Sequence, residues 1–237
     1  VPERVQEKLK EIFTLNSLSQ NNIIIYNTES VIDMHDSAKL ILREKKDSSM
    51  GLGLQLLANG EGDAFVSAGS TAALVFGAST IVKRIKGIKR ASLATVIPSD
   101  KGHFMLLDSG ANVACRPEML KSFAIMGSCY MEKIMNIASP RVALLNNGTE
   151  DTKGRELELQ AYKLLKETTT INFIGNVEAR DVINAYTDII VCDGFTGNIL
   201  LKSTEGVAMS VMNLIKETLL NSDLYSLGLV MYKLLAG

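Results

Sequence analysis

Small and polar residues directly follow a short apolar run near residue 190. The run Ile189–Cys192 suits a strand that is buried on both faces of a parallel sheet. Asp193 ends the run, and Gly194 and Gly197 permit backbone geometries that other residues cannot adopt. Asn198 is predicted to cap the following helix, so unpaired N–H groups and the positive end of the helix dipole would face the strand's carboxyl end. This pattern favours binding of an anion, and a ligand-free connection between strand and helix is the alternative.

Two earlier stretches have the same organisation. After a predicted strand at residues 63–67, a turn of small residues leads into a predicted helix at residues 71–82, and this turn contains Ser67, Gly69, Ser70 and Thr71. A predicted strand at residues 103–108 is followed by the small, polar run that ends at Asn112. Because the carboxyl ends of parallel strands meet at one edge of a sheet, these turns are expected to lie near each other.

A single lysine stands in a loop of comparable design. Lys153 lies in the loop 146–154, which follows the predicted strand 141–145 and precedes a predicted helix at 155–166. Its ammonium group is therefore expected to reach the same sheet edge as the other turns. The alternative is an ordinary solvated lysine in a surface loop.

Several other chemistries lack their sequence signatures. The dinucleotide fingerprint fails because Leu56 stands where its third glycine belongs, and no Walker A, H-E-x-x-H or paired C-x-x-C motif occurs. His35 and His103 are the candidates for a histidine base, and both are interpreted as bystanders. Cys192 is interpreted as a small buried residue rather than a nucleophile. Nucleotide-driven and zinc chemistry therefore have little support.

The composition indicates a globular chain with an aliphatic core. Of 237 residues, 46% are hydrophobic but only 5% are aromatic. The 25 basic and 26 acidic residues nearly cancel, which gives no reason to expect nucleic acid as a partner. The three cysteines lack the spacing of a zinc site or a disulfide scaffold, and no signal peptide is recognised, so a cytoplasmic location is expected.

The order of the predicted elements indicates an α/β fold. Strands alternate with helices, which favours a three-layer, doubly wound and mainly parallel sheet with one antiparallel excursion, in a single domain over residues 1–237. The excursion is a predicted hairpin of residues 91–98 and 103–108. Further strands are predicted at residues 22–26 and 171–174, and further helices at 2–13, 37–43, 48–60, 117–137 and 198–221.

The end of the chain, residues 222–237, contains an apolar helical pattern at residues 224–235. The pattern is too short to cross a bilayer. It is predicted to pack against a partner chain or to lie on a membrane surface, and a core or dimer helix is the simpler alternative.

Six stretches of the sequence carry a family resemblance when they are taken in order. Together they resemble the bacterial phosphate acyltransferase family, PlsX. The stretches are Ser67–Leu74, Leu106–Glu118, Phe123–Ser128, Pro140–Gly154, Ile171–Asp181 and Val191–Gly206.

The resemblance implies an enzyme of phospholipid synthesis that moves an acyl group from acyl carrier protein to inorganic phosphate. No cofactor is expected, and no residues are assigned to a metal. It also implies a homodimer that associates peripherally with the membrane, and a fold similar to isocitrate and isopropylmalate dehydrogenases and to phosphate acetyltransferase. The chain departs from the family at Ser70 and Ala72, where asparagine and glycine are typical. The family's amino-terminal strand with its glycine-rich turn, and its carboxyl-terminal end, are not recognised in this sequence.

Residue roles follow as hypotheses from the resemblance and the chemistry. Lys153 and Asn198 are predicted to be catalytic, the first by stabilising negative charge and the second by orienting the thioester. A non-catalytic scaffold that binds carrier protein and membrane, or a dehydrogenase of the same fold class, is the alternative. The predicted phosphate and substrate residues are Ser67, Gly69, Ser70, Thr71, Asn112, Asp193, Thr196 and Gly197.

Overall fold

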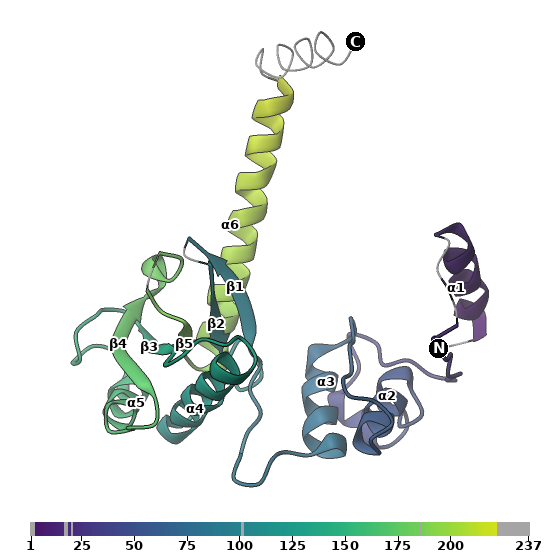
Figure 1. The fold of residues 1–237 in the computed structure, drawn as a ribbon, viewed down its shortest axis with the longest axis horizontal. Helices are drawn as coiled ribbons and strands as arrows, with labels where there is room; N and C mark the ends of the chain where they lie inside the picture. Colours follow the sequence, from purple (N-terminus) through teal and green to yellow (C-terminus); the bar gives the residue numbers. More distant parts are fainter. Residues whose placement is uncertain (1–2, 17–18, 20, 101, 185, 222–237) are drawn as a thin grey trace. The chain divides into compact units, whose positions relative to one another are not determined.

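The computed structural model describes residues 3–16, 19, 21–100, 102–184 and 186–221. Its internal contacts divide the chain into two compact units, residues 1–93 and 94–237, and each is described by itself (Figure 1). The organisation as one domain over residues 1–237 stays a prediction. The apolar segment 224–235 lies outside the described residues.

The first unit is built from short helices around a small core. Two serines cap its helices: Ser48 Oγ accepts a hydrogen bond from Gly51 N at 3.2 Å, and Ser70 Oγ accepts one from Ala73 N at 3.4 Å. The structure confirms the helices predicted from residues 2, 48 and 71. The elements are α1 (Glu3–Leu15), η1 (Ala38–Leu42), α2 (Ser49–Ala58), α3 (Thr71–Gly77) and η2 (Ala78–Val82), and the core comprises Ile32, Ile41, Met50, Leu54 and Ala73.

Two strand predictions for this unit are wrong. Residues 22–26 and 63–67 form no strand, and two of their apolar side chains are solvent-exposed, Ile24 at 78% and Val66 at 93%. A strand needs a neighbouring strand to bond with. Among the described residues of this unit, the isolated bridge between Ser30 and Ser48 is the only such pairing. The predicted helix at 37–43 is the 3₁₀ helix η1, and the side chain of Ser37 does not cap it.

The second unit contains a five-stranded sheet with the order β1-β2-β5-β3-β4. The first two strands pair antiparallel, and the remaining pairs are parallel. The predicted mainly parallel sheet with one antiparallel excursion is therefore confirmed. The strands are β1 (Thr95–Ser99), β2 (Gly102–Leu107), β3 (Arg141–Asn146), β4 (Asn172–Glu178) and β5 (Ile189–Val191).

Helices cover both faces of this sheet (Figure 1). Two helices, α4 (Pro117–Lys133) and α5 (Glu156–Lys166), pack on one face, and the first turns of α6 (Gly194–Asn221) pack on the other through Leu200 and Leu201. The three residues of β5 are fully buried, as its unbroken apolar sequence predicts for a central parallel strand. The short helix η3 (Ala179–Asp181) follows β4. In the part of the chain that the structure describes, no helix has the length and apolar character needed to cross a membrane.

The start of α6 differs from the prediction. The helix begins at Gly194, so Asn198 lies inside it and is not its cap. Asp193 takes that role, because its Oδ1 accepts a hydrogen bond from Thr196 N at 2.8 Å. The carboxylate of Asp193 lies directly at the end of β5, so it is closer than Asn198 to the first backbone N–H groups of α6.

Candidate functional site

The loops after β2 and β5 touch each other at the carboxyl edge of the parallel strands. Gly194 N donates a hydrogen bond to Asn112 O at 2.8 Å. A Cβ placed on Gly197 would lie 2.0 Å from the carbonyl oxygen of Asp108, so only glycine permits this approach. The structure therefore brings Asn112 together with Asp193 and Gly197, as predicted from the sequence for turns at one sheet edge.

The turn after β2 is closed around its own carboxylate. Asp108 is fully buried, and its two oxygens accept hydrogen bonds from the backbone N–H groups of Gly110, Ala111 and Asn112 at 3.1, 2.9 and 2.7 Å. The side-chain amide of Asn112 donates a further bond at 2.7 Å. The donors that an external anion would use at this turn are thus bonded to Asp108.

The turn after β5 is filled in the same way. Asp193, whose side chain is 4% exposed, accepts bonds from Thr196 N and Thr196 Oγ1 and from the Arg155 guanidinium at 2.6 Å. Arg155 also bonds Glu158 Oε1 at 2.5 Å, and the bonds to Glu158 and then to Asp193 raise the pKa of Arg155 above its ordinary value. This turn, expected to receive an anion, therefore already holds a carboxylate of the chain.

Asn198 is tied to the loop after β2 by its amide. Its Nδ2 donates to Ser109 O at 3.3 Å, and a Cβ on Gly110 would lie 3.0 Å from the same nitrogen. Gly110 has φ +142°, which also favours glycine at this position. Asn198 is exposed on the first turns of α6, where its amide can reach an incoming ligand as well as the loop.

Lys153 lies on a backbone that the surrounding loop fixes. Asn146 Nδ2 donates to Lys153 O at 3.0 Å, and Lys153 N donates to Glu150 O at 3.2 Å. The carbonyl of Glu150 is held in turn by Asn176 Nδ2 at 2.7 Å, which ties the loop to β4. The lysine residue itself is exposed. A cation on a fixed backbone can meet a charged ligand without rearrangement of the loop.

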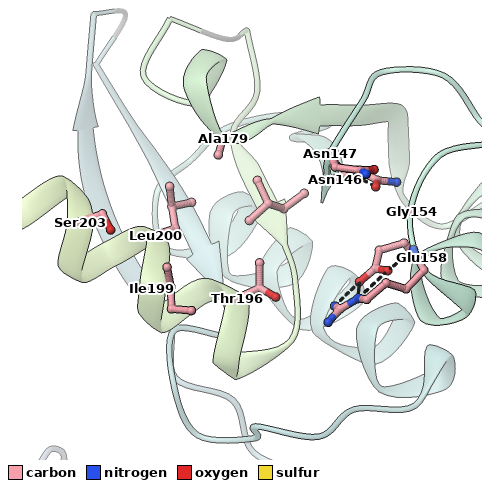
Figure 2. Close-up of a pocket in the computed structure, with 11 residues that line it drawn as sticks. Asn146, Asn147, Gly154, Glu158, Ala179, Thr196, Ile199, Leu200 and Ser203 are labelled. Carbon is pink, nitrogen blue, oxygen red and sulfur yellow. Dashed lines mark hydrogen bonds and ion pairs between the residues drawn. The ribbon is translucent and has the colours of Figure 1, made fainter.

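A cavity of about 610 Å³ lies between this loop and α6 (Figure 2). Gly154 and Ile199 line it, and these residues directly follow Lys153 and Asn198 in the chain. The loop that contains Lys153 and the helix that contains Asn198 therefore both line the cavity, but neither residue itself does, and the Asn198 amide is bonded to the loop after β2. The lining residues are Leu145, Asn146, Asn147, Gly154, Arg155, Glu158, Ala179, Thr196, Ile199, Leu200 and Ser203.

The predicted site residues of the first unit surround the start of α3. Ser70 is buried and caps this helix, Ser67 Oγ accepts a bond from Gly69 N at 3.1 Å, and Thr71 is exposed. Their participation in the site stays a prediction, as do the roles of Lys153 and Asn198.

The cysteines beside the site do not behave as nucleophiles. Cys192 is 3% exposed, and burial raises the pKa of its thiol well above the usual value. Burial also raises the pKa of Cys115 to about 11. Both thiols stay protonated near neutral pH because their pKa values are raised. They are therefore weak nucleophiles, since only a thiolate is strongly nucleophilic. The interpretation of Cys192 as a small buried residue is confirmed.

Sequence reasoning missed Arg155 and Glu158. Their spacing, three residues apart at the start of α5, is a recognisable signal for a pair at a helix start. The contact of Arg155 with Asp193 joins residues 38 apart in the chain, and no local pattern indicates it. The apolar wall of the cavity was also missed, because Ile199 and Leu200 look like ordinary positions of a buried helix face.

Comparison with known proteins gives consistent matches over most of the chain. The sequence profile of the family described as "Fatty acid synthesis protein" matches residues 5–236. The phosphate acyltransferase of Clostridioides difficile (strain 630) is 47% identical over 229 residues, covering 96% of this chain and 67% of the relative. That of Alkaliphilus oremlandii (strain OhILAs) is 46% identical over 210 residues, covering 89% of this chain and 62% of the relative. The chain thus spans about two thirds of the length of these relatives.

Two solved structures share the fold at low sequence identity. A phosphotransacetylase from Streptococcus pyogenes superposes with a TM-score of 0.62, and the EutD phosphotransacetylase from Staphylococcus aureus with 0.58. Each is 18% identical and covers 86% of this chain and 72% of its own. At this identity the likeness establishes the fold only.

Proposed function

The chain belongs to the fatty acid synthesis protein family, in which its curated relatives are enzymes named phosphate acyltransferase, and we propose that it transfers a fatty acyl group from acyl carrier protein to inorganic phosphate. The names of these relatives support acyl transfer to phosphate as the reaction. Acyl carrier protein as the donor, and a role in phospholipid synthesis, are the finer parts of the proposal.

In the proposed reaction, a phosphate oxygen attacks the thioester carbonyl directly. A C–O bond forms, the C–S bond breaks, and the departing thiolate takes a proton from solvent. A phosphate oxyanion is already nucleophilic near neutral pH, and a thiolate leaves readily, so no nucleophile from the protein is needed. The raised pKa values of Cys115 and Cys192 agree with this route, because neither thiol supplies a thiolate near neutral pH.

Lys153 and Asn198 carry the proposed catalytic roles. The ammonium of Lys153 would neutralise charge on the phosphate and on the tetrahedral oxyanion, and the amide of Asn198 would orient the thioester. The observation that carries this proposal is that their segments border one cavity at the carboxyl edge of the sheet.

Eight further residues are proposed to shape the phosphate and substrate site. Within the second unit, Asp193 and Asn112 would act mainly by fixing the turns, because their polar groups are bonded inside the protein. We also propose that the protein is a cytoplasmic homodimer with peripheral membrane contact. The eight residues are Ser67, Gly69, Ser70, Thr71, Asn112, Asp193, Thr196 and Gly197.

The direct test is phosphate-dependent release of carrier-protein thiol from acyl carrier protein. The expected result is stoichiometric formation of thiol and acyl phosphate when phosphate is present, and none when sulfate, a poor nucleophile of similar shape, replaces it. Binding of the carrier protein without release of thiol would instead identify a non-catalytic scaffold.

A further inference from the structure

The cavity in the second unit has one apolar wall and one polar wall. Figure 2 shows Ile199 and Leu200 on α6, with Ala179 above them in the view, and shows Asn146 and Glu158 across the cavity. Its volume of about 610 Å³ falls within the range of pockets that hold small organic ligands. The apolar wall offers a ligand a surface to bury.

The polar groups of the opposite wall are bonded within the protein. Arg155 bonds both Glu158 and Asp193, and Asn146 bonds the backbone of Lys153 and Asn147. Arg155 is the one cation among the lining residues, and its bonds to Glu158 and Asp193 leave little positive charge to attract a phosphate there. The wall therefore offers little to an anion, and the apolar wall opposite favours a ligand whose body is uncharged and apolar.

The cavity is lined by the two segments that carry the predicted catalytic residues. Gly154 follows Lys153 and Ile199 follows Asn198, so a ligand in the cavity lies against the loop and the helix that carry these two residues. An acyl thioester consists of a polar reacting end and an apolar chain. The arrangement of the cavity matches that division.

We propose that this cavity is the binding site for the alkyl chain of the acyl substrate, and that Ile199, Leu200 and Ala179 of its apolar wall determine the preferred chain length. This inference rests on the proposed function, since it places the chain of the same acyl donor. Each methylene buried there contributes about fourfold to binding, until the chain fills the space.

The test compares donors of different chain length in variants that reduce the cavity from two elements, α6 and η3. Ile199→Trp is the first variant, because Ile199 is 51% exposed and its position tolerates a larger side chain. Ala179→Leu, at an exposed position, is the second. We expect kcat/KM for chains of about 16 carbons to fall tenfold or more in both, while chains of about 8 carbons change by less than about threefold.

A matched control lies on the same helix outside the cavity. Val207 is 64% exposed and does not line the cavity, so Val207→Trp should leave the chain-length profile unchanged. An unchanged profile in both cavity variants, or an equal loss for every chain length, would overturn the proposal.

Calorimetric binding of alkyl pantetheine thioethers, which contain no acyl group to transfer, separates this inference from the proposed function. The dissociation constant should fall with chain length in the wild type, and Ile199→Trp should weaken the long thioether at least tenfold. That result supports the alkyl site even if no thiol is released from any donor. Equal affinity for long and short thioethers in the wild type contradicts it, whether or not the protein catalyses acyl transfer.

Discussion

Two kinds of strand end stand side by side at the carboxyl edge of the second unit. The turns after β2 and β5 use their backbone N–H groups to hold the carboxylates of Asp108 and Asp193. The loop after β3 fixes its backbone in a similar way but leaves the side chain of Lys153 exposed beside a cavity. The two kinds of turn have similar sequences. Only the hydrogen-bond partners of their polar groups distinguish a structural turn from a turn that is available to a ligand.

This difference indicates a role in stability for the two aspartates, whereas a role in turnover is what we propose for Lys153. A filled turn stabilises the edge because charge-assisted hydrogen bonds are strong and costly to leave unmade. An exposed lysine contributes little to stability, and its charge remains available for the reaction.

The largest stability effect is expected for Asp108→Ala. The substitution removes the acceptor of three backbone N–H groups and of the Asn112 amide in a fully buried turn. We expect the free energy of unfolding to fall by about 3 to 5 kcal/mol, measured by urea denaturation. Asp151→Ala, in the exposed loop after β3, is the control and should change it by less than about 0.5 kcal/mol. A loss below about 1 kcal/mol for Asp108→Ala would remove the distinction between the two regions.

Smaller effects on stability, opposite in sign to each other, are expected when two glycines of α6 are replaced by alanine. Gly197→Ala places a Cβ 2.0 Å from the carbonyl oxygen of Asp108 and should destabilise by about 1 to 3 kcal/mol. Gly206→Ala meets no atom within 4 Å and should stabilise by about 0.5 to 1 kcal/mol, because glycine is a poor helix former. Thermal unfolding of both variants measures the contrast. Equal effects would show that α6 does not approach the β2 turn as closely as described.

The smallest effect concerns a carboxylate at the opposite end of β5. Burial raises the pKa of Asp188, but hydrogen bonds from the side chain and backbone of Arg141 outweigh it, so the pKa lies below its ordinary value. The resulting stabilisation is fully present above the unfolded pKa of about 4 and is lost as the pH falls through the lower folded value. Asp188→Asn should remove this part of the acid dependence in urea titrations from about pH 5 to about pH 2. An unchanged dependence would contradict the role of this pair.

The fold of the second unit was largely predicted from sequence, whereas in the first unit the helices were predicted but the two strands were wrong. The runs 141–145 and 189–192 are mainly apolar without alternation, which is typical of strands buried on both faces, and this pattern predicted them. The runs 22–26 and 63–67 have similar composition, but no neighbouring strand among the described residues pairs with them. Local composition indicates which secondary structure a segment prefers, but the neighbouring strands available to it decide whether it forms a strand.

The same limit applies to the site. The exposed Lys153 loop was predicted, because a polar loop after a buried strand depends only on neighbouring residues. The ion pair that occupies the turn after β5 was not predicted, because it joins Asp193 to Arg155, 38 residues away in the chain. The cap expected at Asn198 was displaced for a local reason, since Asp193 lies closer to the first free N–H groups of α6.

The most direct test of the whole account measures Lys153→Ala for turnover and stability in one preparation, with exposed Lys163→Ala as the control. We predict that kcat for phosphate-dependent thiol release falls by about 100-fold to 1000-fold in the first variant only. The free energy of unfolding should change by less than about 0.5 kcal/mol in both. A Lys153→Ala protein with kcat within about threefold of wild type, or one that loses kcat only because it unfolds, would contradict the central claim.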